Sequence, residues 1–277
     1  MAGKKKDTSL LHHLIGSRSL VWNLAKNDIK KKFAGSYFGV VWAFVQPVIT
    51  VLLYWFVFEK GLNSKATDLR TGIEIPFVLW LTAGLVPWFY FQEALNGGTG
   101  VLVEYSYLVK KVVFQIDMLP VVKMISALFT HLFFVAFTIV LFICMGYMPD
   151  WYALQVVYYS FCMILFATGL VYATSAVTVF FRDMKEVVGI LLQIGMWVTP
   201  IMWNFETMVQ IPGWAIAVLK LNPMYYIVSG YRNALINHIG FWEDMGITVY
   251  FWVVTAVILF LGTTVFKRLR PHFAGVL

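Results

Sequence analysis

Long apolar stretches separated by short polar segments dominate the pattern along this chain. Six stretches contain no Asp, Glu, Lys or Arg: Phe38–Phe58, Ile75–Gln92, Met124–Met148, Trp151–Phe181, Val187–Phe205 and Gly246–Phe266. A helix that crosses a bilayer needs about 20 predominantly apolar residues. The second and fifth stretches lie close to that limit and the others reach it. The pattern therefore predicts an all-α integral membrane protein with six transmembrane helices.

A different periodicity precedes the first of these stretches. Within Leu20–Phe33, the apolar residues Val21, Leu24, Ala25 and Ile29 recur at helical spacing, and the polar residues Asn23, Lys26 and Lys30 fall elsewhere on the helical wheel. An apolar stripe on a basic helix is typical of a helix that lies in the membrane interface. We therefore expect an N-terminal amphipathic helix at the cytoplasmic surface.

Two segments between the apolar stretches are polar or rich in turn-forming residues. The connection after the second stretch predicts a short helix on the cytoplasmic surface, at about 104–118. The segment at about 201–243 predicts re-entrant helices that dip into the outer leaflet. The chain thus divides into a cytoplasmic N-terminal segment (1–37), a six-span domain (38–266) and a cytoplasmic tail (267–277).

The distribution of charge supports this arrangement and predicts its orientation. Charged residues make up 13% of the chain, well below the soluble average of about 25%. In the six-span arrangement, sixteen of the 21 Lys and Arg residues fall on the side of the two termini, and the other five are Lys60, Lys65, Arg70, Lys220 and Arg232. Because basic residues are enriched in cytoplasmic loops, both termini are predicted to be cytoplasmic. The net charge of +7 then suits anionic headgroups better than nucleic acid.

Residues for catalysis or ion coupling are scarce. No G-x-x-x-x-G-K-[ST] motif is present, so we expect no ATPase site, no catalytic residue and no bound cofactor in this chain. Two ionisable residues lie in or beside the apolar stretches and are candidates for ion coupling. We interpret Glu93 as a capped carboxylate at the inner interface and His131 as a hydrogen-bonded packing residue. Cys144 and Cys162 both fall in predicted spans and indicate neither a disulfide nor a metal site.

Aromatic residues, 18% of the chain, are abundant. Phe38, Trp42 and Gln46 recur at i, i+4 and i+8, and Trp197 and Trp203 flank Pro200. Rings beside amides suit sugars, whose C–H faces stack on aromatic rings and whose hydroxyls need hydrogen bonds. The same spacing also packs one helix against another, so both interpretations stay open.

The order of several motifs resembles a known family. They are Tyr37–Phe38–Gly39, Trp42–Ala43–Phe44–Val45–Gln46–Pro47, Tyr54–Trp55–Phe56–Val57–Phe58, Gly84–Leu85–Val86–Pro87–Trp88–Phe89, Phe181–Arg182–Asp183, Thr199–Pro200–Ile201 and Leu221–Asn222–Pro223–Met224–Tyr225–Tyr226. In this order, from about Ser19 to Lys267, the chain resembles permease subunits of bacterial ATP-binding-cassette exporters of polysaccharide. Those subunits export teichoic acids, lipopolysaccharide O-antigens or capsular polysaccharides.

The resemblance implies partners and site residues. It implies a homodimer in the bacterial cytoplasmic membrane, joined by two ATPase subunits that hold ATP and Mg²⁺, with the substrate path between the protomers. The implied path residues are Phe38, Trp42, Gln46, Ile49, Trp197, Thr199 and Trp203. The segment at about 104–118 would be the coupling helix on the ATPase, with contacts from Tyr107, Lys110, Lys111, Phe114 and Asp117.

The function predicted from these observations is ATP-driven export of lipid-linked polysaccharide, of the teichoic acid or O-antigen type. One alternative is a stand-alone channel or secondary transporter, which would need charged groups inside the membrane. Another is a membrane-embedded enzyme acting on glycans or lipids, which would need clustered acid and base residues.

Overall fold

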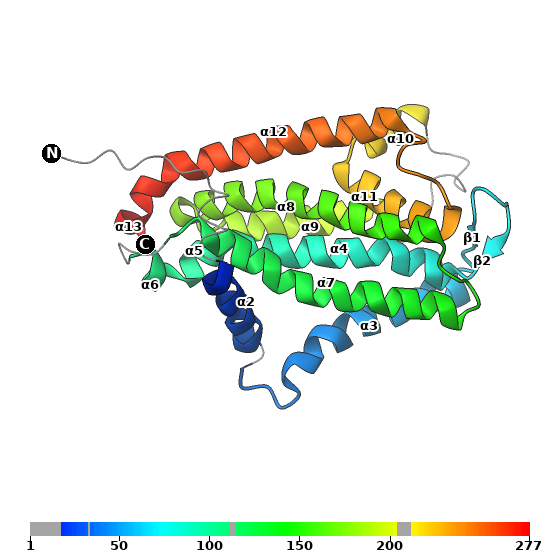
Figure 1. Ribbon diagram of the computed structural model, residues 1–277, viewed down its shortest axis with the longest axis horizontal. Helices are drawn as coiled ribbons and strands as arrows, with labels where there is room; N and C mark the ends of the chain where they lie inside the picture. The colour runs from blue at the N-terminus through cyan, green and yellow to red at the C-terminus, as the bar shows by residue number, and fades with distance from the viewer. Residues whose placement is uncertain (1–17, 33, 111–114, 204–211) are drawn as a thin grey trace.

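A computed structural model describes residues 18–32, 34–110, 115–203 and 212–277. Its long helices are α4 (Phe77–Thr99), α7 (Met118–Cys144), α8 (Gln155–Phe180), α9 (Met184–Val198) and α12 (Met245–Leu269). They lie side by side along the longest axis of the molecule (Figure 1). Helix α3 (Trp42–Trp55) follows the 3₁₀ turn η1 (Gly39–Val41), continues into the π-helical segment η2 (Phe56–Gly61), and packs on α4.

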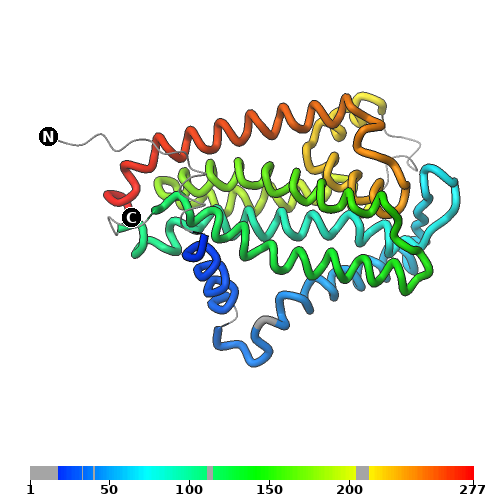
Figure 2. The backbone as a smooth tube through the Cα atoms, in the orientation of Figure 1, coloured from blue at the N-terminus to red at the C-terminus, as the bar shows by residue number. Residues whose placement is uncertain are grey.

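Short elements gather at the two ends of this bundle (Figure 2). One end, here called the α5 end, holds α5 (Val101–Glu104), α6 (Ser106–Val109), η6 (Arg270–His272) and α13 (Phe273–Val276). The opposite end, the hairpin end, holds β1 (Ala66–Thr67), β2 (Glu74–Ile75), η3 (Trp151–Leu154), α10 (Gly213–Lys220), α11 (Pro223–Arg232) and η5 (Asn233–Asn237). Helix α2 (Arg18–Lys32) runs across the bundle axis and packs on α7, as an interfacial helix would.

Among the described residues, four helical segments are long and apolar enough to cross a membrane: Trp42–Gly61, Met118–Cys144, Trp151–Phe180 and Met245–Val276. They coincide with four of the six predicted apolar stretches. The other two stretches correspond to α4 and α9. Helix α9 has 15 residues, or about 22 Å at 1.5 Å per residue, and α4 carries polar residues in its second half.

The polar residues of α4 are compatible with its position, because other helices cover it. It packs against α3, α7, α8, α9 and α11. Most of its side chains are buried, including the large rings of Trp88 and Tyr90. A helix enclosed by protein does not need the uniformly apolar surface that lipid requires, so α4 has a lower hydropathy than the lipid-facing helices.

Glycine allows the closest approach within the bundle, between α8 and α12. A Cβ atom on Gly262 would lie 1.9 Å from the carbonyl oxygen of Gly169. Small residues at such crossings let helix backbones approach, and the dispersion energy of that contact is a main source of helix association in lipid.

Two features differ from the predicted all-α pattern. The loop between η2 and α4 forms an antiparallel hairpin in which Ala66 pairs with Ile75. At its turn, Asp68 accepts hydrogen bonds from the Thr71 hydroxyl and the Arg70 N–H. Burial by itself would raise the pKa of Asp68, but these hydrogen bonds lower the pKa below its ordinary value.

The second difference lies at the α5 end, where one surface helix was predicted at about 104–118. In the described part of that range the chain forms the single-turn helix α6, separated from α5 by Tyr105. Residues 111–114 lie outside the described residues. In the segment after the fifth stretch, where short helices were predicted, the chain forms α10 and α11. Residues 204–211 of that region lie outside the described residues.

The close contact at Gly262 leads to a stability prediction. Gly262→Ala should lower the stability of the folded protein by about 1–3 kcal/mol, because the added methyl group overlaps backbone atoms that cannot move aside. Thermal unfolding of the detergent-solubilised protein would measure the change. The matched control is Gly189→Ala on α9, where an added Cβ meets no atom within 4 Å. Unfolding midpoints that are equal in the two variants would contradict the packing argument.

Candidate functional site

A cavity of about 570 Å³ lies between α2, α3, α4 and α7. On α3, its wall contains Trp42, Gln46, Thr50 and Tyr54. These residues repeat every four positions, so they share one face of the helix. This face combines two aromatic rings with an amide and a hydroxyl group.

The wall on α4 is polar as well. Gln92, Glu93 and Asn96 line the cavity there, beside the ring of Phe89. Amides present both donors and acceptors, and aromatic rings present an apolar face. The cavity can therefore contact a neutral polyhydroxy ligand through both its hydroxyls and its C–H groups.

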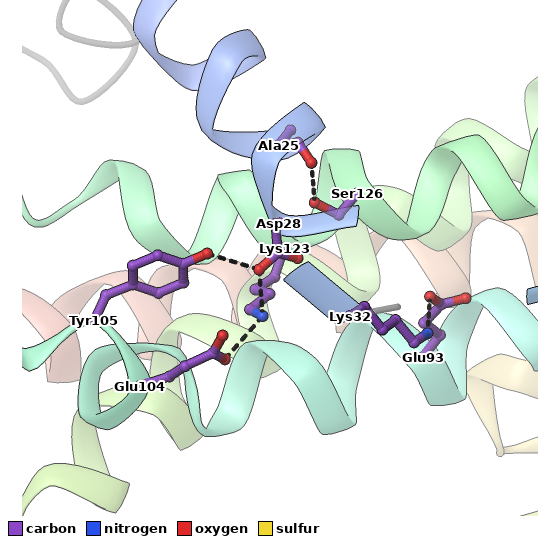
Figure 3. Close-up of polar contacts among 8 residues, drawn as sticks. All are labelled: Ala25, Asp28, Lys32, Glu93, Glu104, Tyr105, Lys123 and Ser126. Atoms are coloured by element: carbon purple, nitrogen blue, oxygen red, sulfur yellow. Dashed lines mark hydrogen bonds and ion pairs between the residues drawn. The ribbon is translucent and has the colours of Figure 1, made fainter. Parts of the chain in front are cut away.

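Paired charges occupy the part of the cavity next to α2 (Figure 3). The Lys32 ammonium contacts a Glu93 carboxylate oxygen at 2.7 Å. The Lys123 ammonium lies 2.6 Å from Asp28 and 2.8 Å from Glu104. Because the Lys123 and Asp28 side chains are 13% and 8% exposed, this second pair is largely shielded from water.

Neutral hydrogen bonds extend this network. The Tyr105 hydroxyl donates to Asp28 at 2.8 Å, and the Ser126 hydroxyl donates to the carbonyl of Ala25 at 3.1 Å (Figure 3). Burial, together with the hydrogen bond to Asp28, raises the pKa of Tyr105, so this hydroxyl stays a donor at neutral pH. The network joins α2 to α7 and to the α5–α6 segment.

A second buried charge lies near the hairpin end. The Arg232 guanidinium donates to the carbonyls of Pro200 and Ile201, both at 2.7 Å, and to that of Trp80 at 3.3 Å. It also stacks on the Trp80 ring, with 3.3 Å between the guanidinium carbon and the ring centroid. A Cβ at Gly84 would lie 2.7 Å from this guanidinium, so glycine provides the space for it. Arg232 therefore ties α11 to α4 and to the residues that follow α9.

Comparison with known proteins identifies the family. Residues 19–236 match the family model described as ABC-2 type transporter, which is most of the chain. The chain belongs to the ABC-2 type transporter membrane family.

Relatives match this ABC-2 chain over nearly its whole length. It is 25% identical to the O-antigen export system permease protein RfbA of Myxococcus xanthus, over 96% of this chain and 98% of the relative. Two Klebsiella pneumoniae proteins of the same name are 21% and 20% identical, each over 92% of this chain and 93% of the relative. The similarity therefore extends over whole chains and is not limited to one motif.

The structure separates the predicted path residues of the first stretch into two groups. Trp42 and Gln46 line the cavity. Phe38 and Ile49 do not line it and are 59% and 47% exposed. Phe38 contacts Trp42 edge to face, with ring centroids 5.9 Å apart, so it extends the aromatic surface beyond the cavity rim.

The predicted path residues near α9 also differ from one another. Trp197 is 57% exposed, and its carbonyl accepts a hydrogen bond from the Trp203 indole at 2.8 Å. Thr199 is fully buried, and its hydroxyl accepts a hydrogen bond from the Asn222 amide at 2.8 Å. Thr199 is therefore enclosed by protein, and its side chain anchors the start of α11.

The predicted ATPase contacts that the structure describes, Tyr107, Lys110 and Asp117, lie at the α5 end. Tyr107 and Lys110 are exposed there, whereas Lys111 and Phe114 lie outside the described residues. Asp117 is not an exposed contact: it is buried, and its carboxylate pairs with Arg270 at 2.7 Å. That ion pair joins the start of α7 to the end of α12.

Other ionisable residues have internal roles. The interpretation of Glu93 as a capped carboxylate agrees with its ion pair to Lys32. The interpretation of His131 as a packing residue agrees with its hydrogen-bond distances of 3.1 Å to the Tyr231 hydroxyl and 3.2 Å to that of Ser160. The sequence counts Arg232 among the outer basic residues, and the structure shows in addition that its side chain is buried. Its isolation in the mostly uncharged helix α11 was the available signal.

The buried ion pair at α2 leads to a second prediction. Lys123→Met leaves the Asp28 carboxylate buried without its cation and should cost about 3 kcal/mol of stability. Adding Asp28→Asn should recover part of that loss, because no uncompensated charge remains. Thermal unfolding of the three proteins would measure this coupling.

The matched control is Glu93→Gln, which breaks a more exposed pair and should cost less than about 1 kcal/mol. A double variant no more stable than Lys123→Met would show that the charge pairing does not hold α2 in place.

Proposed function

We propose that this chain is the membrane subunit of an ATP-driven exporter that moves lipid-linked polysaccharide, of the O-antigen or teichoic acid type, across the bacterial cytoplasmic membrane. The observation that supports it most is the cavity lined by aromatic and amide side chains, in a chain whose relatives over nearly full length are named O-antigen export permeases.

The composition of the cavity suits a moving polymer. A glycan that slides along a path needs many weak, interchangeable contacts, because one tight site would retain it. The α3 face provides such contacts through the rings of Trp42 and Tyr54 and the amide of Gln46. In a homodimer, the exposed residues Phe38, Ile49 and Trp197 would extend this surface toward the second copy.

The proposed arrangement has six spans, with α4 as the second and α9 as the fifth. Both termini are then cytoplasmic and the α5 end is the inner end. The basic residues support this orientation: Lys123, Arg182 and Arg268 belong to segments at the α5 end. Because Lys and Arg are enriched in cytoplasmic loops, the α5 end is the cytoplasmic end in this proposal.

The proposed ATPase contact lies at the same end. Tyr107 and Lys110 are exposed on and beside α6, and Lys111 and Phe114 follow directly in the sequence. The Asp117–Arg270 ion pair would hold the start of α7 and the end of α12 together next to this surface. ATP and Mg²⁺ would bind in the partner subunit.

A prediction for this partnership concerns Tyr107 and Lys110. The double variant Tyr107→Ala/Lys110→Ala should bind the ATPase subunit at least about tenfold more weakly, because it removes one aromatic anchor and one charge from the contact. Co-purification and glycan-stimulated ATP hydrolysis would measure this loss.

Lys65→Ala at the hairpin end is the control and should keep normal ATPase binding. A double variant that binds and stimulates the ATPase as the wild type does would contradict the proposed contact surface.

A second prediction concerns the path. Trp42→Ala should slow export only a few fold, because one stacking contact to a base is worth about 1–3 kcal/mol and a sugar contact is weaker. Trp42→Ala with Gln46→Ala should impair export severely. The control Leu52→Ala removes an exposed apolar side chain of α3 that does not line the cavity.

Polysaccharide at the cell surface should be measured together with the abundance of the protein in the membrane. If the double variant is scarce but exports normally per molecule, these residues pack helices and do not line the path.

A further inference from the structure

Two adjoining cavities at the hairpin end are separate from the cavity of about 570 Å³ that α3 lines, here called the α3 cavity. Their volumes are about 250 and 150 Å³. Both are lined by Tyr225, Ser229, Asn233, Ile239 and Asp244, and none of their lining residues belongs to the α3 cavity. The two therefore form one groove along α11 and η5.

A polar stripe forms one side of this groove. Tyr225, Ser229 and Asn233 recur at i, i+4 and i+8, which places them on one helical face. Within the part of the chain that the structure describes, the Ser229 hydroxyl has no hydrogen-bond partner. The side-chain oxygen of Asn233 accepts a hydrogen bond from the side-chain amide of Asn237 at 2.8 Å. The side-chain nitrogen of Asn233 has no partner among the described residues.

A carboxylate lies at the edge of the groove. One Asp244 oxygen accepts the N–H of Ile247 at 3.2 Å and so caps α12. The other oxygen makes no hydrogen bond to a described residue and remains a free acceptor. A hydroxyl, an amide and a carboxylate thus offer donors and acceptors to the same space.

Aromatic rings stand at both ends of the groove. Trp203 borders the larger cavity, and its orientation is held by the hydrogen bond from its indole to the carbonyl of Trp197. Phe241 borders the smaller cavity and stacks on Tyr158, with ring centroids 4.3 Å apart. Both rings are therefore held in place by contacts outside the groove.

Hydrogen bonds connect the elements that form the groove to neighbouring segments. Arg232 ties α11 to Pro200 and Ile201. Asn237 accepts the N–H of Leu69 at 3.1 Å and so connects η5 to the β-hairpin. A site built on fixed elements loses little conformational entropy when a ligand binds.

We propose that this groove is a saccharide-binding subsite for neutral sugar residues at the hairpin end of the protein. The rings of Trp203 and Phe241 take the C–H faces of the sugar, and Ser229, Asn233 and Asp244 bond its hydroxyls. Arg232 and Lys220 also line the groove. Because the Arg232 guanidinium already donates to three backbone carbonyls and the Asp244 carboxylate adds a negative charge, we expect a neutral ligand to be preferred over a phosphate. This inference rests on the proposed function, because it assigns to the exported glycan a contact point beyond the α3 cavity.

Chemical protection of a residue at the rim tests the proposal. Leu69 lines the larger cavity and is 53% exposed, so Leu69→Cys, with Cys144→Ser and Cys162→Ala, provides a single thiol. The full complex with its ATPase, in lipid nanodiscs, is labelled with an impermeant maleimide. Mannose, galactose or rhamnose hexasaccharides are added as probes. At least one of them should slow labelling at least threefold at saturation.

A matched pair of variants separates the groove from its surroundings. Ser229→Ala/Asn233→Asp removes two donors while keeping the oxygen that accepts from Asn237. It should raise the half-protecting hexasaccharide concentration at least about tenfold. The control Ser64→Ala/Asn63→Asp makes the same changes at the same end, outside both cavities, and should leave that concentration unchanged.

Three results would overturn the subsite: no protection by any hexasaccharide, equal protection in the two double variants, or equal protection by glycerol 3-phosphate. Export measured in proteoliposomes with the same proteins separates the two proposals. Wild-type export without groove protection would reject only the subsite. Failure of the wild-type complex to export or to couple to an ATPase would reject the proposed function, while the labelling would still decide whether the groove binds sugar.

Discussion

The enclosure of α4 by other helices is the constraint on which the rest of the structure depends. Within a bilayer, a polar side chain needs a protein partner or a water-filled space. Because five neighbouring helices cover α4, it can carry Gln92, Glu93 and Asn96 on the cavity wall. Near its other end, Gly84 leaves the space that the Arg232 guanidinium fills. The α3 cavity and the groove at the hairpin end therefore both border the same protected helix.

Two buried cations stabilise opposite ends of the bundle by different means. Lys123 is neutralised by Asp28 and Glu104, whereas the Arg232 guanidinium donates hydrogen bonds to the backbone carbonyls of Trp80, Pro200 and Ile201. A point charge with three donors suits carboxylates from several directions, and the planar fork of arginine suits carbonyls that lie side by side. Removing either cation would leave its oxygen acceptors away from water and without a hydrogen-bond donor. Lys123 therefore joins α7 to α2 and α5, and Arg232 joins α11 to α4 and to the residues after α9.

The charged network also gives the proposed transport a physical connection. Tyr105 lies between α5 and α6, next to the proposed ATPase contact, and its hydroxyl bonds Asp28 on α2. Asp28 and Lys32 of the same helix line the cavity that contains Trp42 and Gln46. In the proposed transport, a displacement of the α5–α6 segment would therefore move α2 and change the cavity that we propose as the glycan path. The hydrogen bonds and ion pairs on this route are short and specific, unlike the weak contacts that suit the glycan itself.

The sequence by itself determined the helical membrane architecture and the family, because apolar length and the order of motifs are local properties. It also brought Trp42 and Gln46 to one helix face. It did not show that Thr199 and Asp117 point inward, that Arg232 is buried, or that the loop before α4 forms a hairpin. The burial of Asp117 and of Arg232 depends on partners far apart in the chain: Asp117 pairs with Arg270 and Arg232 with Trp80, which are 153 and 152 residues apart. Only the tertiary structure decided them, because the free energy of a buried polar group is set by what surrounds it.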